Sequence, residues 1–553
     1  MDIVCKPIDT LEELFETIKN PPQWINRINQ LTQPPPFVIK NTFYDCHVSE
    51  NDYEPKTRIT RNETPKTLIC HDMKGGYLCD KFIDGCHEGN GFTFHRWAQT
   101  DIFCYFSHHF VTIPPLQWIN LAHKNGTLVL GTIITEHEKG KEICKKIFND
   151  FEVAKKFADA LIEVCVIYKF DGWLLNFENQ ISCPKILLQF VEYLSFKIHR
   201  EIPSSQIIWY DSVLYNGKLS WQNELNENNR CFFDCCDGIF LNYFWNEEKI
   251  AKTQIQAGDR RFDVYVGIDI WGRGTYGGGQ FQAYKAADII QQFGLSTAIF
   301  AHGWVHEKTI EIPEHDFLNR YYSRDSLFWK LLWPYLYTKP IQQPFTTFFK
   351  TGVNSNCYDL NSQQIQPTYF PAHALTIETM HLTVAREVCR CVQERLISDE
   401  RMLLISSHHL HEKNVIHRLF SMNLKLKINT VIDIYTYRVE DHFTDFAIVL
   451  LMVDEENKKV KCVANSKTIT TFERKISRIS NIIKPEIYYK NKDEEFDENR
   501  QEDRNENRTN EGVKQYDRRR FVFTYPEHEL LEVGIKLLDG SYLYLSGFSI
   551  QTN

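Results

Sequence analysis

The sequence predicts an α/β protein, a (β/α)₈ TIM barrel followed by one or two C-terminal β-sandwich domains. Between about residues 66 and 303, eight short apolar runs alternate with helical stretches. Polar and aromatic residues follow these runs at the same end each time. After about residue 345, strand-like segments separated by turn residues replace the alternation, which indicates a β-rich region.

The eight runs are rich in Val, Ile, Leu and Phe without strict alternation, as is typical of strands buried on both faces. A doubly wound sheet is the alternative, but eight units and their total length favour the barrel. The runs are Thr67–Cys70, Asp101–Phe106, Thr127–Ile134, Tyr168–Phe177, Ile207–Tyr210, Gly238–Tyr243, Val264–Ile270 and Ala298–Ala301.

Three of the stretches between the runs have clear helical signals. Phe151–Ile167 repeats apolar residues at the spacing of one helix face. Pro184–His199 begins with a proline suited to a first turn, and Gln280–Gly294 ends at a glycine suited to a C-cap. Helices that alternate with buried strands are what a barrel of βα units requires.

Polar side chains gather where the predicted strands end. In a barrel these ends surround one mouth, where active sites are built. The alternative is that these residues are polar only because loops are polar, and their recurrence at the same end of every strand argues against it. The residues are His71 and Asp72, Ser107–His109, Thr135 and Glu136, Asn176 and Glu178, Tyr210 and Asp211, Asn242 and Trp245, Asp269, and His302–Trp304.

The segment Phe170–Asn179 is the most informative of the chain. In an extended strand, side chains two residues apart share a face, so Asn176 and Glu178 project together. The carboxyl group can give and take a proton, whereas the amide can hold a substrate without titrating. The purely structural alternatives are a hydrogen-bonded amide at a strand end and a glutamate in a salt bridge.

The pattern of predicted helices and strands divides the chain into three parts. We expect residues 1–55 to pack on the barrel, residues 56–345 to form the catalytic barrel, and residues 346–553 to form the β-sandwich region. Inside that last region, the stretch near 490–520 is dense in both charges and almost free of apolar residues. This composition predicts a disordered charged loop.

Composition excludes several classes of function. The chain has 553 residues, and its formal net charge of −9 argues against a nucleic-acid partner. We expect no membrane segment because no stretch of about 18 apolar residues occurs. The first twenty residues lack a secretory signal, so the 16 cysteines are expected to be reduced thiols of a cytosolic protein. Neither the cysteines nor the histidines show zinc spacing, and we expect no metal and no cofactor.

Seven segments in order carry a family resemblance. They are Cys70–Tyr77, Phe94–Asp101, Leu130–Glu136, Phe170–Asn179, Trp209–Leu225, Phe240–Trp245 and Val266–Gly274. Together they resemble the cytosolic endo-β-N-acetylglucosaminidases of glycoside hydrolase family 85. One segment alone would be weak, but seven in the family's order make chance similarity untenable.

The resemblance implies hydrolysis of the β-1,4 bond between the two core N-acetylglucosamines of an N-glycan. The implied mechanism is retaining and substrate-assisted, which departs from the scheme with two protein carboxylates. Glu178 is then the general acid and later the general base, and the nucleophile is the 2-acetamido oxygen of the substrate. Asn176 holds the acetamido nitrogen, and Tyr210 hydrogen-bonds the same acetamido group. At these three positions the sequence retains the residues of the family pattern.

The same resemblance predicts residues that bind the sugars. We expect Trp97, Trp221, Trp245 and Trp304 to stack on sugar faces, although tryptophans in general are more often core residues. Glu136 is expected to bond sugar hydroxyls or to tune Glu178.

Other residues near the mouth have less specific roles. His71 and Asp72 are expected to brace the barrel, and Asp269 to brace it or to take part in the site. The glycine-rich segment Gly272–Gly279 lacks the ending of a phosphate-binding loop and is interpreted as a flexible loop that faces the glycan. Ile270–Trp271 departs from the family pattern, which predicts one reshaped subsite.

The expected partners are N-glycans, glycopeptides or misfolded glycoproteins in the cytosol, and transglycosylation is expected besides hydrolysis. A catalytically silent glycan-binding protein on the same barrel is one alternative, which the intact Glu178, Asn176 and Tyr210 argue against. A chitinase-like hydrolase is another, which the amide at position 176 and the lack of a secretory signal argue against.

Overall fold

The computed structural model describes thirteen stretches of the chain, which fall into two compact units. Of the described residues, the first unit comprises those within 3–40 and 59–337, and the second those within 41–58 and from 338 onward. The described stretches are 3–42, 47–85, 91–311, 317–347, 392–397, 400–406, 414–438, 445–465, 471–473, 485–489, 515–523, 528–538 and 542–552.

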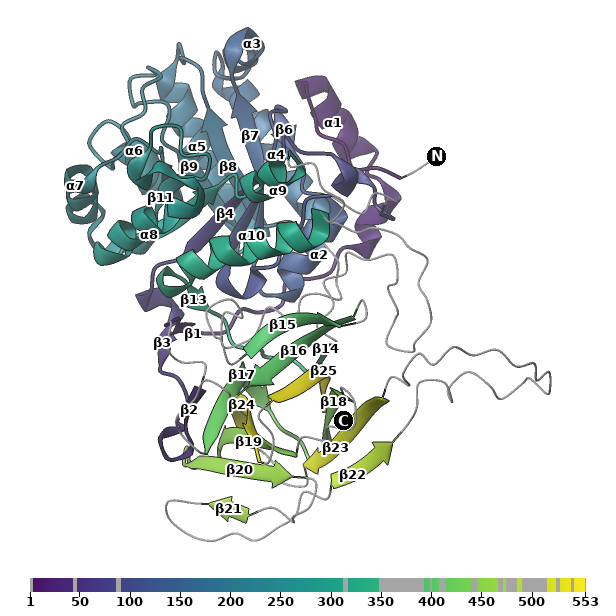
Figure 1. The fold of residues 1–553 in the computed structure, drawn as a ribbon. Helices are drawn as coiled ribbons and strands as arrows, with labels where there is room; N and C mark the ends of the chain where they lie inside the picture. The colour runs from purple at the N-terminus through teal and green to yellow at the C-terminus, as the bar shows by residue number, and fades with distance from the viewer. Residues whose placement is uncertain are drawn as a thin grey trace. The chain divides into compact units, whose positions relative to one another are not determined.

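The first unit is a closed barrel of eight parallel strands (Figure 1). Each strand pairs with the next one in the chain, and β12 returns to pair with β4. The short strand β6 (Val111–Thr112) adds an antiparallel partner to β7. The barrel strands are β4 (Thr67–Asp72), β5 (Ile102–Phe106), β7 (Leu128–Thr135), β8 (Gly172–Phe177), β9 (Gln206–Tyr210), β10 (Gly238–Leu241), β11 (Val264–Asp269) and β12 (Ser296–Phe300). Each of the eight predicted runs overlaps one of these strands, so the TIM barrel is confirmed.

Helices lie outside the strands, and the predicted starts at Phe151 and Pro184 are confirmed, whereas the helix predicted over Gln280–Gly294 spans Ala283–Gln292. Helix α4 begins after Asp150, whose side chain accepts a hydrogen bond from the N–H of Glu152, and ends before Lys169 in left-handed backbone. Pro184 opens α5. The helices are α1 (Leu11–Lys19), α2 (Leu116–Lys124), α3 (His137–Ile147), α4 (Phe151–Tyr168), α5 (Pro184–Glu201), α6 (Arg230–Cys235), α7 (Glu247–Ala257), α8 (Ala283–Gln292), α9 (Trp304–Ile310) and α10 (Phe317–Leu332).

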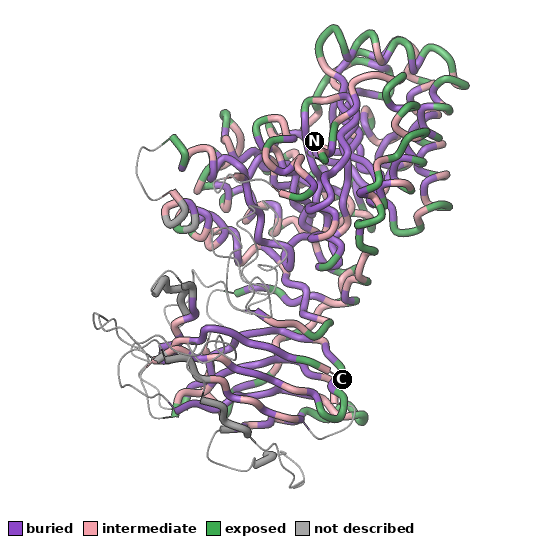
Figure 2. The backbone as a smooth tube through the Cα atoms, turned by 90° about the vertical axis from the view of Figure 1, so that its right-hand side faces the viewer, coloured by how far each residue is buried: buried purple, intermediate pink, exposed green. Residues whose placement is uncertain are grey.

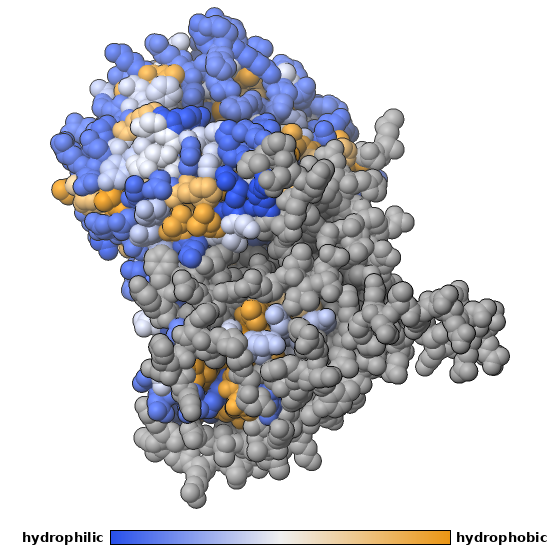
Figure 3. All heavy atoms as spheres, viewed as in Figure 1, coloured by the Kyte–Doolittle hydropathy of each residue, from blue (hydrophilic) through white to orange (hydrophobic). Residues whose placement is uncertain are grey.

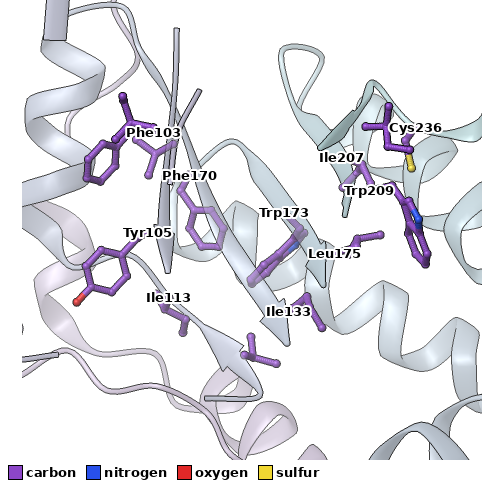
Figure 4. Close-up of a cluster of buried hydrophobic side chains, with 14 of the residues drawn as sticks. Phe103, Tyr105, Ile113, Ile133, Phe170, Trp173, Leu175, Ile207, Trp209 and Cys236 are labelled. Carbon is purple, nitrogen blue, oxygen red and sulfur yellow. The ribbon is translucent and has the colours of Figure 1, made fainter. Parts of the chain in front are cut away.

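Alternate residues of each barrel strand belong to two separate apolar clusters. On β8, Leu174 packs with residues of the other strands inside the barrel. Its neighbours Trp173 and Leu175 belong to the larger cluster between the strands and the helices, where Figure 4 shows them near Trp209 of β9. This alternation decides which side chains reach the interior of the barrel.

Burial follows the same layers. In Figure 2 the buried backbone runs through the sheets, whereas the exposed backbone lies on outer helices and turns. The described part of the first unit that faces the viewer in Figure 3 is mostly hydrophilic, and its hydrophobic residues form scattered patches. None of the described helices is both long and apolar enough to cross a membrane.

The second unit is a β-sandwich of two antiparallel sheets. Strands of both sheets contribute side chains to one apolar core, which includes Leu545 of one sheet and Phe420 of the other. One sheet contains β14 (Phe345–Thr347), β15 (Val392–Ile397), β16 (Glu400–Ser406), β25 (Tyr542–Gln551), β18 (Thr430–Arg438), β23 (Gln515–Phe523) and β22 (Pro485–Tyr489). The other contains β2 (His47–Ser49), β17 (Val415–Lys425), β24 (Glu529–Leu537), β19 (Phe446–Val453), β20 (Lys459–Asn465) and β21 (Thr471–Glu473).

Three further short strands form a separate sheet in the order β13 (Tyr337–Thr338), β1 (Phe37–Lys40) and β3 (Arg58–Thr60). The units divide the chain differently from the predicted limits at 55 and 345, because residues 41–58 belong to the second unit, where β2 pairs with β17. The predicted charged loop lies outside the described residues as far as 514. Residues 515–520 belong to β23, so for them the prediction of disorder is wrong.

An ion pair is buried in the sandwich between β17 and β24. The Arg418 guanidinium donates to both carboxylate oxygens of Glu532 at 2.5 and 2.7 Å, and their side chains are only 8% and 1% exposed. Removing one partner leaves a buried charge without compensation. We expect Glu532→Ala to lower the free energy of unfolding by about 3–5 kcal/mol, and Arg418→Met with Glu532→Leu to recover most of it.

Urea denaturation of the three proteins checks this expectation. If Glu532→Ala loses less than about 1 kcal/mol, the pair does not stabilise the sandwich in the way proposed.

Candidate active site

The interior of the barrel opens into a cavity of about 470 Å³ at the carboxyl ends of the strands. Its walls contain residues at the ends of β4, β5 and β7–β12, or in the loops that follow them. The predicted mouth of the barrel is therefore a real depression, and four predicted site residues line it: Glu136, Asn176, Glu178 and Tyr210.

Asn176 and Glu178 continue the interior row of β8 beyond Leu174. The Nδ2 of Asn176 donates to the Oε1 of Glu178 at 3.1 Å. The backbone N–H of Glu178 donates to the carbonyl of Thr135 at 2.7 Å, so β7 extends the strand pairing as far as the glutamate. The two side chains share a face, as the strand period predicts.

The carboxyl group of Glu178 is electrostatically suited to holding a proton. Burial raises its pKa, the hydrogen bond from Asn176 lowers it, and the nearby charge of Glu136 raises it again. Glu136 itself lies 3.1 Å from the Nδ1 of His108. A second carboxylate therefore lines the same cavity, although no carboxylate stands at position 176.

The Oδ1 of Asn176 has no hydrogen-bond partner, and the residue is only 4% exposed. A buried acceptor without a donor is unfavourable by about 1–3 kcal/mol. A ligand that brings an N–H or O–H group to this position would satisfy it.

Tyr210 ends β9 and is 6% exposed. Its hydroxyl donates to the Oδ1 of Asn242 at 2.8 Å. Burial raises the pKa of this hydroxyl, as do the charges of Glu178 and Asp211, and a hydrogen bond with Tyr243 lowers it. Tyr210 is thus a neutral phenol in the wall of the cavity.

Gly267 of β11 makes room for Tyr243, which also lines the cavity. A Cβ atom at Gly267 would lie 2.8 Å from the ring of Tyr243 and 2.4 Å from the carbonyl oxygen of Leu241. A larger residue at Gly267 would therefore displace the Tyr243 ring.

The carboxylate of Asp269 organises the loop that follows β11. It accepts from the N–H of Trp271 at 3.1 Å and from the Nε of Arg273 at 2.7 Å. The loop closes on itself because the backbones of Gly272 and Gly279 meet, and both have positive φ. Trp271 and Arg273 consequently reach the cavity wall, and Asp269 positions them.

The predicted sugar-binding tryptophans do not line the cavity. Trp97, Trp245 and Trp304 are 1%, 4% and 4% exposed and pack in the cluster outside the barrel. Such burial leaves no ring face for a sugar, so these three predictions are wrong. Trp221 is 38% exposed, in the β9–α6 segment, and stays a prediction.

Sequence reasoning missed Tyr243 and Trp271 as lining residues, whereas Arg273 lies in the segment Gly272–Gly279 that is interpreted from the sequence as facing the glycan. Trp271 enters the sequence prediction only as a departure from the family pattern. The signal that could have found them is distance from the strand: Tyr243 and Trp271 each come two residues after their strand ends. His71, by contrast, faces outward, where its Nδ1 lies 3.0 Å from the Nε2 of His302.

Metal ligation has no support within the described residues, where no group of three or more His, Cys, Asp or Glu side chains could hold an ion.

The sequence profile of Glycosyl hydrolase family 85 matches residues 76–357. The chain belongs to this family. The match begins within the β4–β5 loop and contains the ends of the seven barrel strands that follow it.

Curated relatives carry the name cytosolic endo-beta-N-acetylglucosaminidase. The chain is 44% identical to that of Gallus gallus over 343 residues (59% of this chain, 46% of the relative). It is 42% identical to the relative from Homo sapiens over 324 residues (56% of this chain, 43% of the relative). It is also 42% identical to cytosolic endo-beta-N-acetylglucosaminidase 1 of Arabidopsis thaliana over 340 residues (58% of this chain, 49% of the relative). The alignments thus span about half the length of these curated relatives.

One solved structure supports the fold of this family 85 chain. It is the glycoside hydrolase domain of Endo-D from Streptococcus pneumoniae, with a TM-score of 0.67 at 15% identity. The similarity covers 100% of this chain and 84% of that one.

Asp211 anchors the segment behind Tyr210. Its buried carboxylate accepts from the N–H groups of Gln222 and Asn223 at 3.3 and 2.6 Å and from the Nδ2 of Asn229 at 2.9 Å. Burial nevertheless raises its pKa from 3.8 to about 6. The folded protein therefore holds this proton more tightly than the unfolded chain does.

This pKa predicts a pH dependence of stability. The contribution of Asp211 is fully present below pH 3.8 and is lost as the pH rises through about 6. We expect the stability of the wild type relative to Asp211→Asn to fall by on the order of 2–3 kcal/mol over that interval. Denaturation curves at several pH values measure this difference, and parallel pH profiles of the two proteins would contradict it.

Proposed function

We propose that this protein is an endo-β-N-acetylglucosaminidase that cleaves the β-1,4 bond between the two core N-acetylglucosamines of N-glycans. The observation that carries the proposal is the pairing of Glu178 with Asn176 in one cavity, where the carboxyl group has a raised pKa and the amide oxygen lacks a donor. Family membership and the printed activity of the relatives support it.

In the proposed reaction the substrate supplies the nucleophile. The 2-acetamido carbonyl oxygen attacks C1 while the glycosidic C1–O bond breaks, and Glu178 gives its proton to the leaving oxygen. The result is an oxazolinium ion, with Asn176 holding the acetamido N–H. Glu178 then takes a proton from water as the water oxygen bonds to C1, which restores the acetamide with retained configuration. An acceptor sugar in place of water gives transglycosylation.

Orientation is the main catalytic resource of such a site. An intramolecular nucleophile that is held against C1 can gain about 7 kcal/mol or more over an untethered one. The raised pKa of Glu178 serves the same reaction, because a general acid must be protonated when the glycosidic bond begins to break.

The substrates that fit this proposal are free N-glycans, glycopeptides and misfolded glycoproteins. The relatives are named cytosolic, and we propose the cytosol as the working compartment of this chain. One N-acetylglucosamine would remain on the peptide after cleavage.

The first test is glycan release from a high-mannose glycopeptide. We expect wild-type protein to release the glycan, and Glu178→Gln to do so about 10²–10⁴ times more slowly because the amide cannot transfer a proton. Glu138→Gln is a matched control, since that side chain is 85% exposed. An inactive wild type would contradict the proposed function, and an active Glu178→Gln would contradict the role of Glu178.

The second test separates substrate assistance from a mechanism in which Glu136 is the nucleophile. We expect Asn176→Ala to lose hydrolysis because the acetamide is no longer oriented. The same variant should still transfer a preformed sugar oxazoline to an acceptor, since the orienting step is already complete. Rates with both donors, measured by chromatography, decide the question. An oxazoline no better than the natural glycan would contradict the role of Asn176.

A further inference from the structure

A chain of hydrogen-bonded side chains lies behind Tyr210. The Tyr210 hydroxyl is 2.8 Å from the Oδ1 of Asn242, which follows β10 and is 7% exposed. The Nδ2 of Asn242 is 2.7 Å from the Oδ1 of Asn223, in the segment between β9 and α6. Tyr210 lines the cavity and the two asparagines do not. Tyr210 is the cavity-lining side chain to which this hydrogen-bonded chain leads.

Two backbone groups determine how both amides are oriented. The N–H of Phe244 donates to the Oδ1 of Asn223 at 2.9 Å, and the Nδ2 of Asn223 donates to the carbonyl of Trp221 at 3.2 Å. A backbone N–H can only donate and a carbonyl can only accept, so the two ends of the Asn223 amide are distinguished.

The orientation of the Asn223 amide in turn determines that of Asn242 and of the Tyr210 hydroxyl. Because the oxygen of Asn223 faces Asn242, Asn242 must present its NH₂ group there and its own oxygen to Tyr210. The single proton of the phenol is then directed at Asn242. Turning that proton towards the cavity would leave the buried oxygen of Asn242 without a donor, which is unfavourable.

We propose that Asn242, oriented by Asn223, is a positioning residue that keeps the Tyr210 hydroxyl proton away from the cavity, so that Tyr210 meets the substrate as a hydrogen-bond acceptor. The identity of the substrate group rests on the proposed function. The orientation of the hydroxyl does not.

The chemistry of the neighbouring amide fits this assignment. Asn176 donates its NH₂ to Glu178 and presents an oxygen without a partner. Asn176 and Tyr210 thus both offer acceptors, and the single N–H of a 2-acetamido group is the donor that the two would share. The acetamido carbonyl oxygen, which is the nucleophile of the proposed reaction, then receives no hydrogen bond from Tyr210 and keeps its lone pairs for C1.

A double-mutant cycle tests the coupling between Asn242 and Tyr210. Glycan release from a glycopeptide is measured for Asn242→Ala, Tyr210→Phe and the double variant. We expect Asn242→Ala to lower kcat roughly tenfold, as for the loss of one hydrogen bond, with little change in KM. In the Tyr210→Phe background the same substitution should have almost no further effect. Losses that multiply in the double variant would overturn the proposal, because they would mean that Asn242 acts independently of the hydroxyl.

Two further variants separate positioning from general damage. Asn242→Asp retains an acceptor for the Tyr210 proton, so it should keep more activity than Asn242→Ala. Asn246→Ala, a matched control, removes an asparagine that caps α7 by accepting from the N–H of Lys249. It should leave kcat unchanged. Equal losses in Asn242→Asp and Asn242→Ala would count against the proposal.

A spectroscopic measurement decides the orientation without catalysis. The Raman doublet of tyrosine distinguishes a hydroxyl that donates from one that only accepts, and subtracting the Tyr210→Phe spectrum isolates Tyr210. We expect a donor signature in the wild type that is lost in Asn242→Ala and retained in Asn246→Ala. An acceptor-only signature in the wild type would overturn the proposal. If the wild type fails to cleave the glycopeptide, the proposed function fails, and the Raman result still decides the orientation of Tyr210.

Discussion

The closed parallel barrel is the constraint on which the rest of the site depends. In each strand alternate side chains point into the barrel, and closure brings the carboxyl ends of all eight strands to one opening. Leu174 therefore fills the interior, while Asn176 and Glu178, two and four residues later, reach the cavity. Displacing this strand by one residue would place Leu175 and Phe177 there instead.

The cavity places the carboxyl group of Glu178 next to two neutral hydrogen-bonding groups, the Asn176 amide and the Tyr210 phenol. Glu178 is partly buried, and the carboxylate whose charge raises its pKa, Glu136, is paired with His108. Burial and the charge of Glu136 both raise the pKa of Glu178, which suits an acid more than a nucleophile. This arrangement supports the proposed division of roles, in which the protein supplies the acid and the substrate supplies the nucleophile.

Much of the support for the site comes from side chains that never touch the cavity. Asp211 holds the segment that contains Asn223, and Asn223 orients Asn242 behind Tyr210. On the other side, Asp269 holds the loop that carries Trp271 and Arg273. In both cases a buried carboxylate accepts from at least one backbone N–H of the segment, so that the segment has a defined path.

The tryptophans show where prediction from residue type fails. A residue that follows a strand can face either the cavity or the helices, and its position in the sequence does not tell the two apart. Trp97 packs against Phe103 and Trp118, and the indole N–H of Trp245 donates to the carbonyl of Gly267. Burying so large a ring against other apolar groups stabilises the fold by about 2–3 kcal/mol, which favours the core position.

The sequence by itself determined the barrel, the β-rich second part and the pair Asn176 and Glu178. These depend on short-range patterns, namely apolar runs, helix signals and the two-residue period of a strand. Only the tertiary structure decided which loop residues line the cavity and how the tyrosine hydroxyl is directed. The path of a loop depends on hydrogen bonds between residues far apart in the chain, such as Phe244 to Asn223, and no local pattern encodes them.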